Sequence, residues 1–293
     1  MKTVVVALGG NALLRPRERG TVKGQLKHVN ETISNIKKLF RKYRVVITHG
    51  NAPQVGGLLI QQEISKKKIP PMPLDVLDAM TQGQLGYLIQ RSLDEKLKVR
   101  AVTVITQILV DKNDKAFKKP TKPIGPYYKN KVERNMIREP EGWRKVVASP
   151  RPIKIIEIEE IMSLIKAGFT VIACGGGGIP VIKEEEMLKG VEAVIDKDYA
   201  TEKLAEQIKA NIMIFLTDVD YVYLDYESRR RTPIREMNSK EAQKYMKHFK
   251  EGSMRPKIEA AVEFLKKGGE KVIITSPKLL DKALKGKSGT VIR

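Results

Sequence analysis

Several residue types on which other classes of protein depend are scarce in this sequence. Cysteine occurs once, at Cys174, so an intrachain disulfide and a multi-cysteine metal cluster are both excluded. The three histidines, His28, His49 and His248, leave few options for histidine-based catalysis. We expect His28 and His248 to lie on the surface and His49 to shape a turn. Aromatic residues make up 5% of the chain, which is too few to indicate a base-stacking surface.

Long apolar segments are also missing. No run approaches the roughly 18 apolar residues that a membrane-spanning helix needs, and the mean hydropathy is −0.31. The apolar run Val4–Leu8 is too short for a signal peptide, and Gly9 and Gly10 interrupt it. These absences predict a cytoplasmic protein without a membrane segment.

The familiar nucleotide-binding and catalytic motifs are absent as well. The segment Asp281–Ser288 ends in Gly-Lys-Ser like a Walker A loop, but Asp281 stands where that loop needs its first glycine. No G-x-G-x-x-G follows a predicted strand, and there is no H-E-x-x-H, G-x-S-x-G or H-R-D. The sequence therefore disfavours P-loop, dinucleotide-binding Rossmann, zinc-protease, serine-hydrolase and protein-kinase sites.

Positive charge, by contrast, is abundant. The chain has 55 lysines and arginines against 34 acidic residues, a net charge of +21, and the basic residues are spread along its whole length. Such a charge fits a nucleic-acid partner, an anionic substrate or a heat-adapted surface. The runs Lys66–Lys68 and Arg229–Arg231 are not interleaved with aromatics, so we expect them to be solvated and a nucleic-acid partner to be disfavoured.

Apolar segments rich in β-branched residues alternate with helical patterns along the chain. Most of these segments are continuous, as in strands that are buried on both faces of a parallel sheet. The expected strands are 3–8, 45–48, 101–110, 169–174, 212–216 and 271–275, and the expected helices are 25–42, 77–97, 157–167, 200–208 and 256–267. The alternation predicts an α/β fold in which helices cover both faces of an open sheet.

One stretch, residues 111–152, breaks this alternation. It is rich in Pro, Lys, Asn and Gly and is too long for a plain connection, so we expect a small subdomain or an excursion over the site. A modest lobe boundary is expected near residues 209–211, just before the strand 212–216.

The loops that follow the expected strands share a glycine-rich or polar character. They are Gly9-Gly10-Asn11, His49–Gly56, Gly175–Gly178 and Thr217–Asp220. In open α/β sheets, ligands bind beyond the carboxyl ends of the strands, and glycine lets main-chain N–H groups approach an anion closely. Repetition of such loops at one edge of a sheet predicts a site for a highly charged ligand.

Five longer blocks stand out in order along the chain. They are Ala7–Ala12, Thr48–Gly56, Pro120–Pro126, Val194–Asp198 and Gly252–Lys257. Together they resemble the motifs of the carbamate kinases, within the amino-acid kinase superfamily, and the resemblance covers essentially the whole chain. Two positions depart from the family pattern, because Ala52 stands where glycine is usual and Cys174 where serine is frequent.

The resemblance implies a single domain over residues 1–293. Its fold would be a three-layer αβα sandwich around an open, mostly parallel, eight-stranded sheet with a small protruding subdomain. An acid-substrate lobe would span 1–209, with the subdomain in 111–152, and a nucleotide lobe would span 210–293. The resemblance also implies a homodimer, with the apolar helical faces between Leu58 and Leu97 as candidate interfaces, and a role in arginine metabolism.

The reaction implied by the resemblance is ATP + carbamate ⇌ ADP + carbamoyl phosphate. Because the acceptor oxygen is already anionic, catalysis needs positioning and cations, not a general base. By the family match, the catalytic residues are Lys122, Lys197, Asp198 and Lys257. Carbamate and the transferring phosphate would bind Gly9, Gly10, Asn11, Gly50 and Asn51. ATP or ADP would bind Thr217, Asp218, Val219, Tyr221, Tyr223 and Met254. Mg²⁺ would enter with the nucleotide, held by phosphates and water, without a protein ligand.

Two alternatives stay open at this point. One is another kinase of the superfamily, acting on a different small acid or phosphate. The loops at Gly9 and Gly175 lack the histidine that isopentenyl phosphate kinases carry. The other alternative is a basic nucleic-acid-binding protein on the same fold, which salt-dependent binding of RNA or DNA would support.

Overall fold

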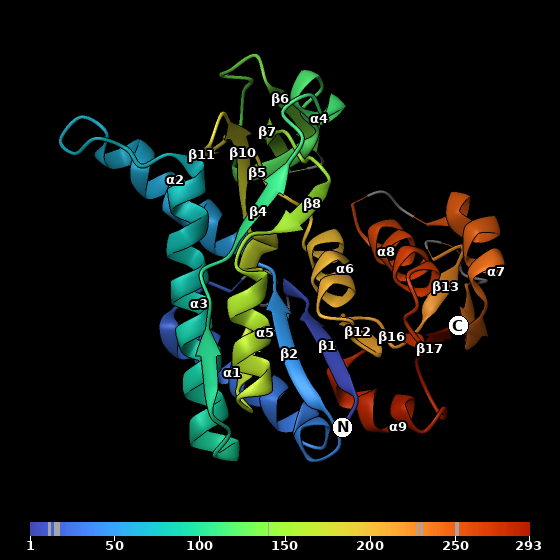
Figure 1. Cartoon of the computed structure of the whole chain (residues 1–293). Helices are drawn as coiled ribbons and strands as arrows, with labels where there is room; N and C mark the ends of the chain where they lie inside the picture. Colours follow the sequence, from blue (N-terminus) through green and yellow to red (C-terminus); the bar gives the residue numbers. More distant parts are fainter. Residues whose placement is uncertain (11–12, 15–17, 140, 227, 229–230, 250–251) are drawn as a thin grey trace.

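A computed structural model describes residues 1–10, 13–14, 18–139, 141–226, 228, 231–249 and 252–293. At its centre is an eight-stranded sheet with the strand order β15-β17-β16-β12-β1-β2-β9-β3 (Figure 1). Neighbouring strands are parallel, except that β16 and β17 are antiparallel. The strands are β1 (Thr3–Leu8), β2 (Arg44–His49), β3 (Ala101–Thr103), β9 (Thr170–Ile172), β12 (Ile212–Leu216), β15 (Glu236–Met237), β16 (Lys271–Thr275) and β17 (Thr290–Ile292). The expectation of an open, mostly parallel sheet is confirmed.

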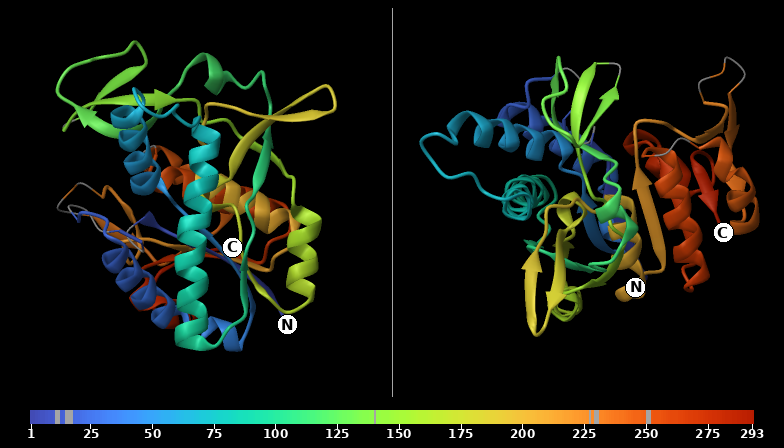
Figure 2. Two further views of the ribbon diagram at one scale, coloured as in Figure 1. Left: turned by 90° about the vertical axis from the view of Figure 1, so that its left-hand side faces the viewer. Right: turned by 90° about the horizontal axis from the view of Figure 1, so that it is seen from above.

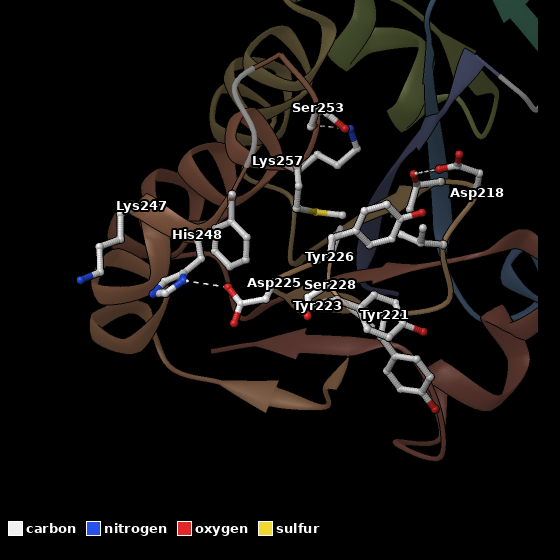
Figure 3. A pocket seen from close by; sticks show the side chains of 14 residues that line it. Asp218, Tyr221, Tyr223, Asp225, Tyr226, Ser228, Lys247, His248, Ser253 and Lys257 are labelled. Atoms are coloured by element: carbon white, nitrogen blue, oxygen red, sulfur yellow. Dashed lines mark hydrogen bonds and ion pairs between the residues drawn. The ribbon is translucent and has the colours of Figure 1, made fainter. Parts of the chain in front are cut away.

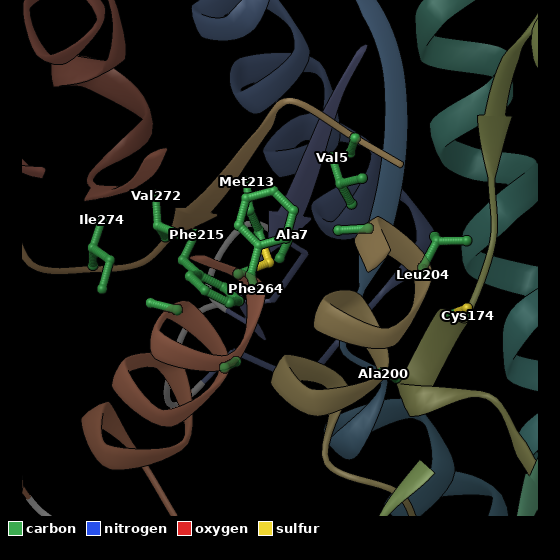
Figure 4. Packing of buried hydrophobic residues seen from close by; sticks show 14 of the residues in the cluster. Val5, Ala7, Cys174, Ala200, Leu204, Met213, Phe215, Phe264, Val272 and Ile274 are labelled. Atoms are coloured by element: carbon green, nitrogen blue, oxygen red, sulfur yellow. The ribbon is translucent and has the colours of Figure 1, made fainter. Parts of the chain in front are cut away.

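Helices cover both faces of this sheet and produce three layers (Figure 1). One face carries α1 (Val22–Ile36), α3 (Leu74–Leu97) and α9 (Leu280–Leu284). The other face carries α5 (Ile158–Lys166), α6 (Lys197–Gln207), α7 (Ser239–Lys244) and α8 (Met254–Lys266). Side chains along β1 alternate between the two layers. Val4 and Val6 pack with the first group of helices, while Val5 and Ala7 pack with the second (Figure 4). The αβα sandwich is therefore confirmed.

Three smaller sheets extend this core within the described residues. A four-stranded sheet contains β11 (Met187–Gly190), β10 (Ile179–Glu184), β4 (Gln107–Val110) and β8 (Pro152–Ile155). A hairpin pairs β13 (Val222–Leu224) with β14 (Thr232–Ile234). The third sheet contains β5 (Lys122–Tyr128), β7 (Gly142–Val147) and β6 (Met136–Glu139), and the short helix α4 (Lys115–Lys118) precedes it. Figures 1 and 2 show this three-stranded sheet projecting from the sandwich on the side away from α9, as a small protruding subdomain.

The structure corrects one expected strand. Residues 101–110 are two strands in two different sheets, because β3 pairs with β9 in the main sheet and β4 pairs with β10 in the smaller one. The crossing point is fixed by the buried amide of Gln82, whose Oε1 accepts from the Thr106 main-chain N at 2.8 Å while its Nε2 donates to the Thr106 carbonyl at 3.1 Å. A continuous apolar run therefore does not distinguish one strand from two.

The structure also contains α2 (Ala52–Ser65), which the expected elements omitted. Adjacent glycines, Gly56 and Gly57, weaken the helical signal there. Ala52 adopts no positive φ, so its methyl group causes no backbone strain at the position where the family usually has glycine.

The prediction of a surface position for His28 is wrong. His28 is only 4% exposed on α1, and its Nε2 lies 2.7 Å from Glu18 Oε2. The same prediction for His248 is confirmed, because His248 is exposed, with its Nδ1 3.5 Å from Asp225 Oδ1. Among the described residues, no helix is long and apolar enough to span a bilayer.

Candidate active site

The four predicted catalytic residues come together where the protruding subdomain meets α6 and α8. Asp196 is the N-cap of α6, and its Oδ1 accepts from the main-chain N of Asp198 at 3.0 Å. This cap places Lys197 and Asp198 in the first turn of α6. Lys257 lies near the start of α8 (Met254–Lys266). This helix follows Gly252, a glycine with a φ of +72°.

Asp198 lies between two lysines. Its Oδ1 accepts from Lys197 Nζ in a short charge-assisted contact, and its Oδ2 accepts from Lys257 Nζ at 3.0 Å. The side chains are 4%, 17% and 11% exposed for Asp198, Lys197 and Lys257, so the cluster is largely shielded from water. Two ammonium groups therefore converge on one carboxylate, which leaves a net positive charge at this point.

The surroundings keep Asp198 ionised and Lys197 charged. Burial acts to raise the pKa of Asp198, but the adjacent charges of Lys197 and Lys257 outweigh it and lower the pKa to about 2. Burial acts to lower the pKa of Lys197, but the charges of Asp198 and Asp196 outweigh it and raise the pKa. Burial lowers the pKa of Lys257, and the Asp198 carboxylate only partly opposes this. Asp198 thus contacts both lysines as a carboxylate, and with so low a pKa it is unsuited to accepting a proton near neutral pH.

Lys122 reaches the cluster from β5 of the protruding subdomain. Its Nζ donates to Asp196 Oδ2 at 2.6 Å, while the other oxygen of Asp196 caps α6. Asp196, which lies in the block Val194–Asp198, therefore joins the subdomain to the start of α6. Lys257 Nζ makes a similar local contact, donating to the Ser253 carbonyl at 3.0 Å. Ser253 is the N-cap of α8, but its side chain makes no capping hydrogen bond.

The glycine loops after β1 and β2 have different neighbours, and the second lies beside Lys197. A Cβ built on Gly50 would lie 3.4 Å from Lys197 Cδ, so the loop after β2 runs against this lysine. A Cβ on Gly9 would lie 2.6 Å from the Leu216 carbonyl oxygen, because the loop after β1 passes close to the end of β12. Gly10 has no neighbour within 4 Å of such a Cβ and is exposed. The predicted substrate residue Asn11 lies outside the described residues.

The run Gly175–Gly178 is buried and serves close packing. A Cβ on Gly175 would lie 2.5 Å from His49 Nε2, and one on Gly176 would lie 2.2 Å from Asn51 Nδ2. Burial lowers the pKa of His49 to about 4, so this histidine is neutral and structural at neutral pH. Cys174, just before the run, is buried in the left-handed region at φ 52°, and burial raises the pKa of its thiol. The glycines thus allow close packing against His49 and Asn51 in the loop after β2.

A cavity of about 890 Å³ opens beside Lys257 (Figure 3). All six predicted nucleotide-binding residues line it: Thr217, Asp218, Val219, Tyr221, Tyr223 and Met254. Its wall also contains Tyr226, His248 and Phe249, which the sequence did not single out. The rings of Tyr221 and Tyr223 meet edge to face with centroids 6.2 Å apart. A cavity of this size with aromatic walls and a lysine at one end suits a nucleotide whose phosphates point toward the lysine cluster.

Comparison with known proteins accounts for this arrangement. The model of the amino acid kinase family matches residues 2–276. The chain belongs to the amino acid kinase family. A carbamate kinase of Thermococcus kodakarensis is 45% identical over 312 residues, which cover 100% of this chain and 99% of that protein.

Solved structures agree with this assignment. Carbamate kinase from Giardia lamblia bound to AMP-PNP superposes with a TM-score of 0.93 at 41% identity, covering 99% of this chain and 98% of that one. An isopentenyl phosphate kinase of T. acidophilum superposes with a TM-score of 0.59 at 14% identity, which shows the shared fold alone. The close relatives are thus ATP-dependent phosphotransferases that match over their full length.

In this amino acid kinase, one polar contact of the loop after β2 has no signal in the sequence. The Asn51 side chain is buried, and its Nδ2 donates to Asp78 Oδ1 and to Thr81 Oγ1, both at 2.9 Å. Asp78 and Thr81 lie on α3, 27 and 30 residues away. Only tertiary structure brings them to Asn51. In the sequence, a single aspartate near the start of a helix indicates only a side chain that stabilises the helix dipole.

Proposed function

We propose that this protein is a carbamate kinase, which transfers a phosphoryl group reversibly between ATP and carbamate. The observation that carries the proposal is the ion-pair cluster of Lys122, Lys197 and Lys257. Within it, Lys257 lines the nucleotide-sized cavity, and Lys197 lies beside the glycine loop after β2. The full-length similarity to carbamate kinases supports the choice of acceptor.

The chemistry of the cluster fits transfer to an anionic acceptor. Carbamate needs no deprotonation, but it must approach a nucleotide tail that carries several negative charges. Lys197 and Lys257 would neutralise the phosphoryl group as it moves, and Lys122 would approach from the carbamoyl side. Asp198 would hold the first two lysines at the correct separation. Gly9, Gly10, Asn11, Gly50 and Asn51 would bind carbamate and the transferring phosphate.

Two lobes then divide the work. The cavity is lined by residues between Thr217 and Lys257, which supports a nucleotide lobe over 210–293. The glycine loops after β1 and β2 and the protruding subdomain belong to residues 1–209. Mg²⁺ would be part of the nucleotide substrate. Among the described residues, no group of three His, Cys, Asp or Glu side chains is placed to hold a metal ion, so phosphates and water would be its main ligands. The cytoplasmic location and the role in arginine metabolism stay predictions from the sequence.

A panel of acceptors tests the proposal. With MgATP, we expect ADP release to be fastest by far when bicarbonate and ammonium supply carbamate. Acetate, glutamate, N-acetylglutamate and isopentenyl phosphate should give much lower rates, because their shape or charge does not match the loops around Lys197. Coupled detection of ADP measures each rate. A rate with any other acceptor that equals or exceeds the carbamate rate would refute the assignment.

We further propose that the protein is a homodimer formed through α2 and α3. Apolar side chains on the outer faces of these helices and their connection are exposed: Ile60, Ile64, Ile69, Met72, Val76, Met80 and Tyr87. In the left view of Figure 2, α3 crosses the front of the molecule with no element over it. Large exposed apolar surfaces mark interaction sites on proteins, and a second copy of the chain presents the same side chains.

Light scattering after size exclusion tests this interface. The wild-type mass should be twice the 33.0 kDa of one chain. Ile64→Asp with Met80→Asp should give a monomer, because two carboxylates would be desolvated at the interface. Val132→Asp is a matched control, since this exposed valine lies in the protruding subdomain and its change should preserve the dimer. A wild-type mass of 33.0 kDa would contradict the proposal.

A further inference from the structure

Asn51 stands at the N-cap of α2, but its side chain does not cap the helix. Asn51 is the N-cap of α2, where an asparagine oxygen usually accepts from the second or third main-chain N–H of the helix. Here the side chain makes no capping hydrogen bond to α2. It turns instead to Asp78 and Thr81 on α3. The contacts with α3 therefore replace the hydrogen bond that would otherwise stabilise the start of α2.

The contacts on α3 decide which end of the amide points where. Asp78 Oδ1 and Thr81 Oγ1 both accept from Asn51 Nδ2, and Thr81 Oγ1 itself donates to the Asp78 carbonyl at 2.9 Å, so this hydroxyl can only accept from Asn51. Gly176 packs against the same amide group, since a Cβ on it would lie 2.2 Å from Nδ2 and 2.9 Å from Oδ1. Both N–H bonds of the amide are thus engaged. Asn51 Oδ1 accepts no hydrogen bond from a described residue, and it remains available as an acceptor in the loop after β2.

Asp78 is the member of this group that can change. It is 1% exposed, and its Oδ2 has no hydrogen-bond partner among the described residues. An ionised carboxylate can only accept, which forces Asn51 to present Nδ2 to it; a protonated carboxyl could donate to Oδ1 and permit the amide to flip. Burial raises the pKa of Asp78 to about 7, the hydrogen bond from Asn51 opposes this, and the charges of Asp75 and Glu192 add to the rise.

Carbamate and acetate differ at one group. Both have a planar carboxylate of similar size, but carbamate carries an amino group where acetate carries a methyl group. A site that accepts a hydrogen bond from that amino group rejects the methyl analogue strongly, because the acceptor would be left unpaired. An amide oxygen fixed in the loop beside Lys197 is such an acceptor.

Resting on the proposed function, we propose that Asn51 Oδ1 accepts a hydrogen bond from the amino group of carbamate and carbamoyl phosphate. Asp78 is the positioning residue that holds this oxygen toward the substrate. The fixed orientation requires ionised Asp78. Selectivity for the carbamoyl group should therefore be full above pH 7 and should decline as the pH falls through about 7. The charged and titratable groups that face Asp78 are Asp75 and Glu192, and neither can replace its contact with Asn51.

The test compares two phosphoryl donors. Initial rates of ATP formation from ADP are measured with carbamoyl phosphate and with acetyl phosphate, at pH 6 and pH 8, and the selectivity is the ratio of the two kcat/KM values. In the wild type, this ratio should be higher at pH 8 than at pH 6. In Asp78→Asn, which keeps the shape but accepts and donates equally well, the ratio at pH 8 should drop by roughly tenfold and lose its pH dependence. Thr81→Val, which removes the second acceptor, should lower the ratio in the same direction.

Asp75→Asn is the matched control. It makes the same chemical change one turn earlier on α3, without a contact to Asn51, and should keep the wild-type ratio at pH 8. A ratio in Asp78→Asn equal to that of the wild type at both pH values would overturn the inference. If Asp78→Asn does not fold, a wild-type ratio that is flat between pH 6 and pH 8 would overturn it. Failure of the wild type to use either donor would instead refute the proposed function.

Discussion

Replacing Lys197 or Lys257 by alanine is expected to lower the turnover of ATP formation about a hundredfold or more, the usual effect of removing one preorganised charge contact from a transition state. Both ammonium groups are largely shielded from water, so no solvent cation can substitute readily. Lys→Arg should restore activity only in part, because a planar guanidinium does not fit the place of a compact ammonium beside Asp198. Steady-state kcat with ADP and carbamoyl phosphate measures the effect.

A triple variant controls for the loss of positive charge in general. Lys66, Lys67 and Lys68 follow α2 as exposed residues, and neutralising all three should leave kcat nearly unchanged. This comparison separates lysines that contact the reacting groups from those that only contribute to the net charge of +21. A loss in the triple variant as large as that in Lys197→Ala would show that the division is wrong.

The second large effect is expected for Asp198→Ala, and it should appear in stability as well as in turnover. Removing this carboxylate leaves Lys197 and Lys257 buried side by side without their partner, and breaking a buried charge pair typically costs about 3–5 kcal/mol. For a chain of this size, such a loss lowers the melting temperature by roughly 10 °C. Asp198→Asn should fold better, since an amide oxygen can still accept one hydrogen bond, and yet turn over slowly because the lysines are misplaced.

The pH dependence of this stability difference has a definite sign. The folded-state pKa of Asp198 is about 2, below the ordinary value of an aspartate, so its contribution is complete at neutral pH. It declines as the pH falls from about 4 toward 2, where the carboxylate becomes protonated. Calorimetry of the wild type and Asp198→Ala should therefore show melting temperatures that converge at low pH. Glu263→Ala on α8, which breaks only an exposed pair with Lys266, should change the melting temperature little at any pH. A melting temperature of Asp198→Ala equal to that of the wild type at pH 7 would contradict the account.

The sequence predicted the parts of the fold that depend on local pattern. The strands Thr3–Leu8, Ile212–Leu216 and Lys271–Thr275 have the expected bounds, because continuous β-branched runs between polar loops favour buried parallel strands. The prediction of one strand over residues 101–110 was wrong, because the break between β3 and β4 depends on the amide of Gln82, which is distant in the sequence. His28 lies in a polar stretch, and its burial depends on packing between α1 and a loop that the periodicity does not show.

The candidate site divides in the same way. Lys122, Lys197 and Lys257 lie inside long motifs, and the structure brings all three to two neighbouring aspartates. The contact of Asp78 with Asn51 and the placement of His248 and Phe249 in the cavity wall have no local signature. These arise only when α3 packs beside the loop after β2 and when residues 247–249 line the cavity. Side chains that support a site from a distance are therefore the ones a single sequence conceals.

The most direct test of the central claim follows the phosphoryl group itself. Wild-type protein is incubated with carbamoyl phosphate, ADP and Mg²⁺, and ³¹P NMR records both nucleotide and carbamoyl phosphate signals over time. We predict that ATP appears in step with the loss of carbamoyl phosphate, one for one after subtraction of spontaneous hydrolysis, and that Lys197→Ala suppresses this transfer. Loss of carbamoyl phosphate at only the uncatalysed rate, with no ATP signal, would contradict the assignment of this lysine cluster to phosphoryl transfer from carbamoyl phosphate.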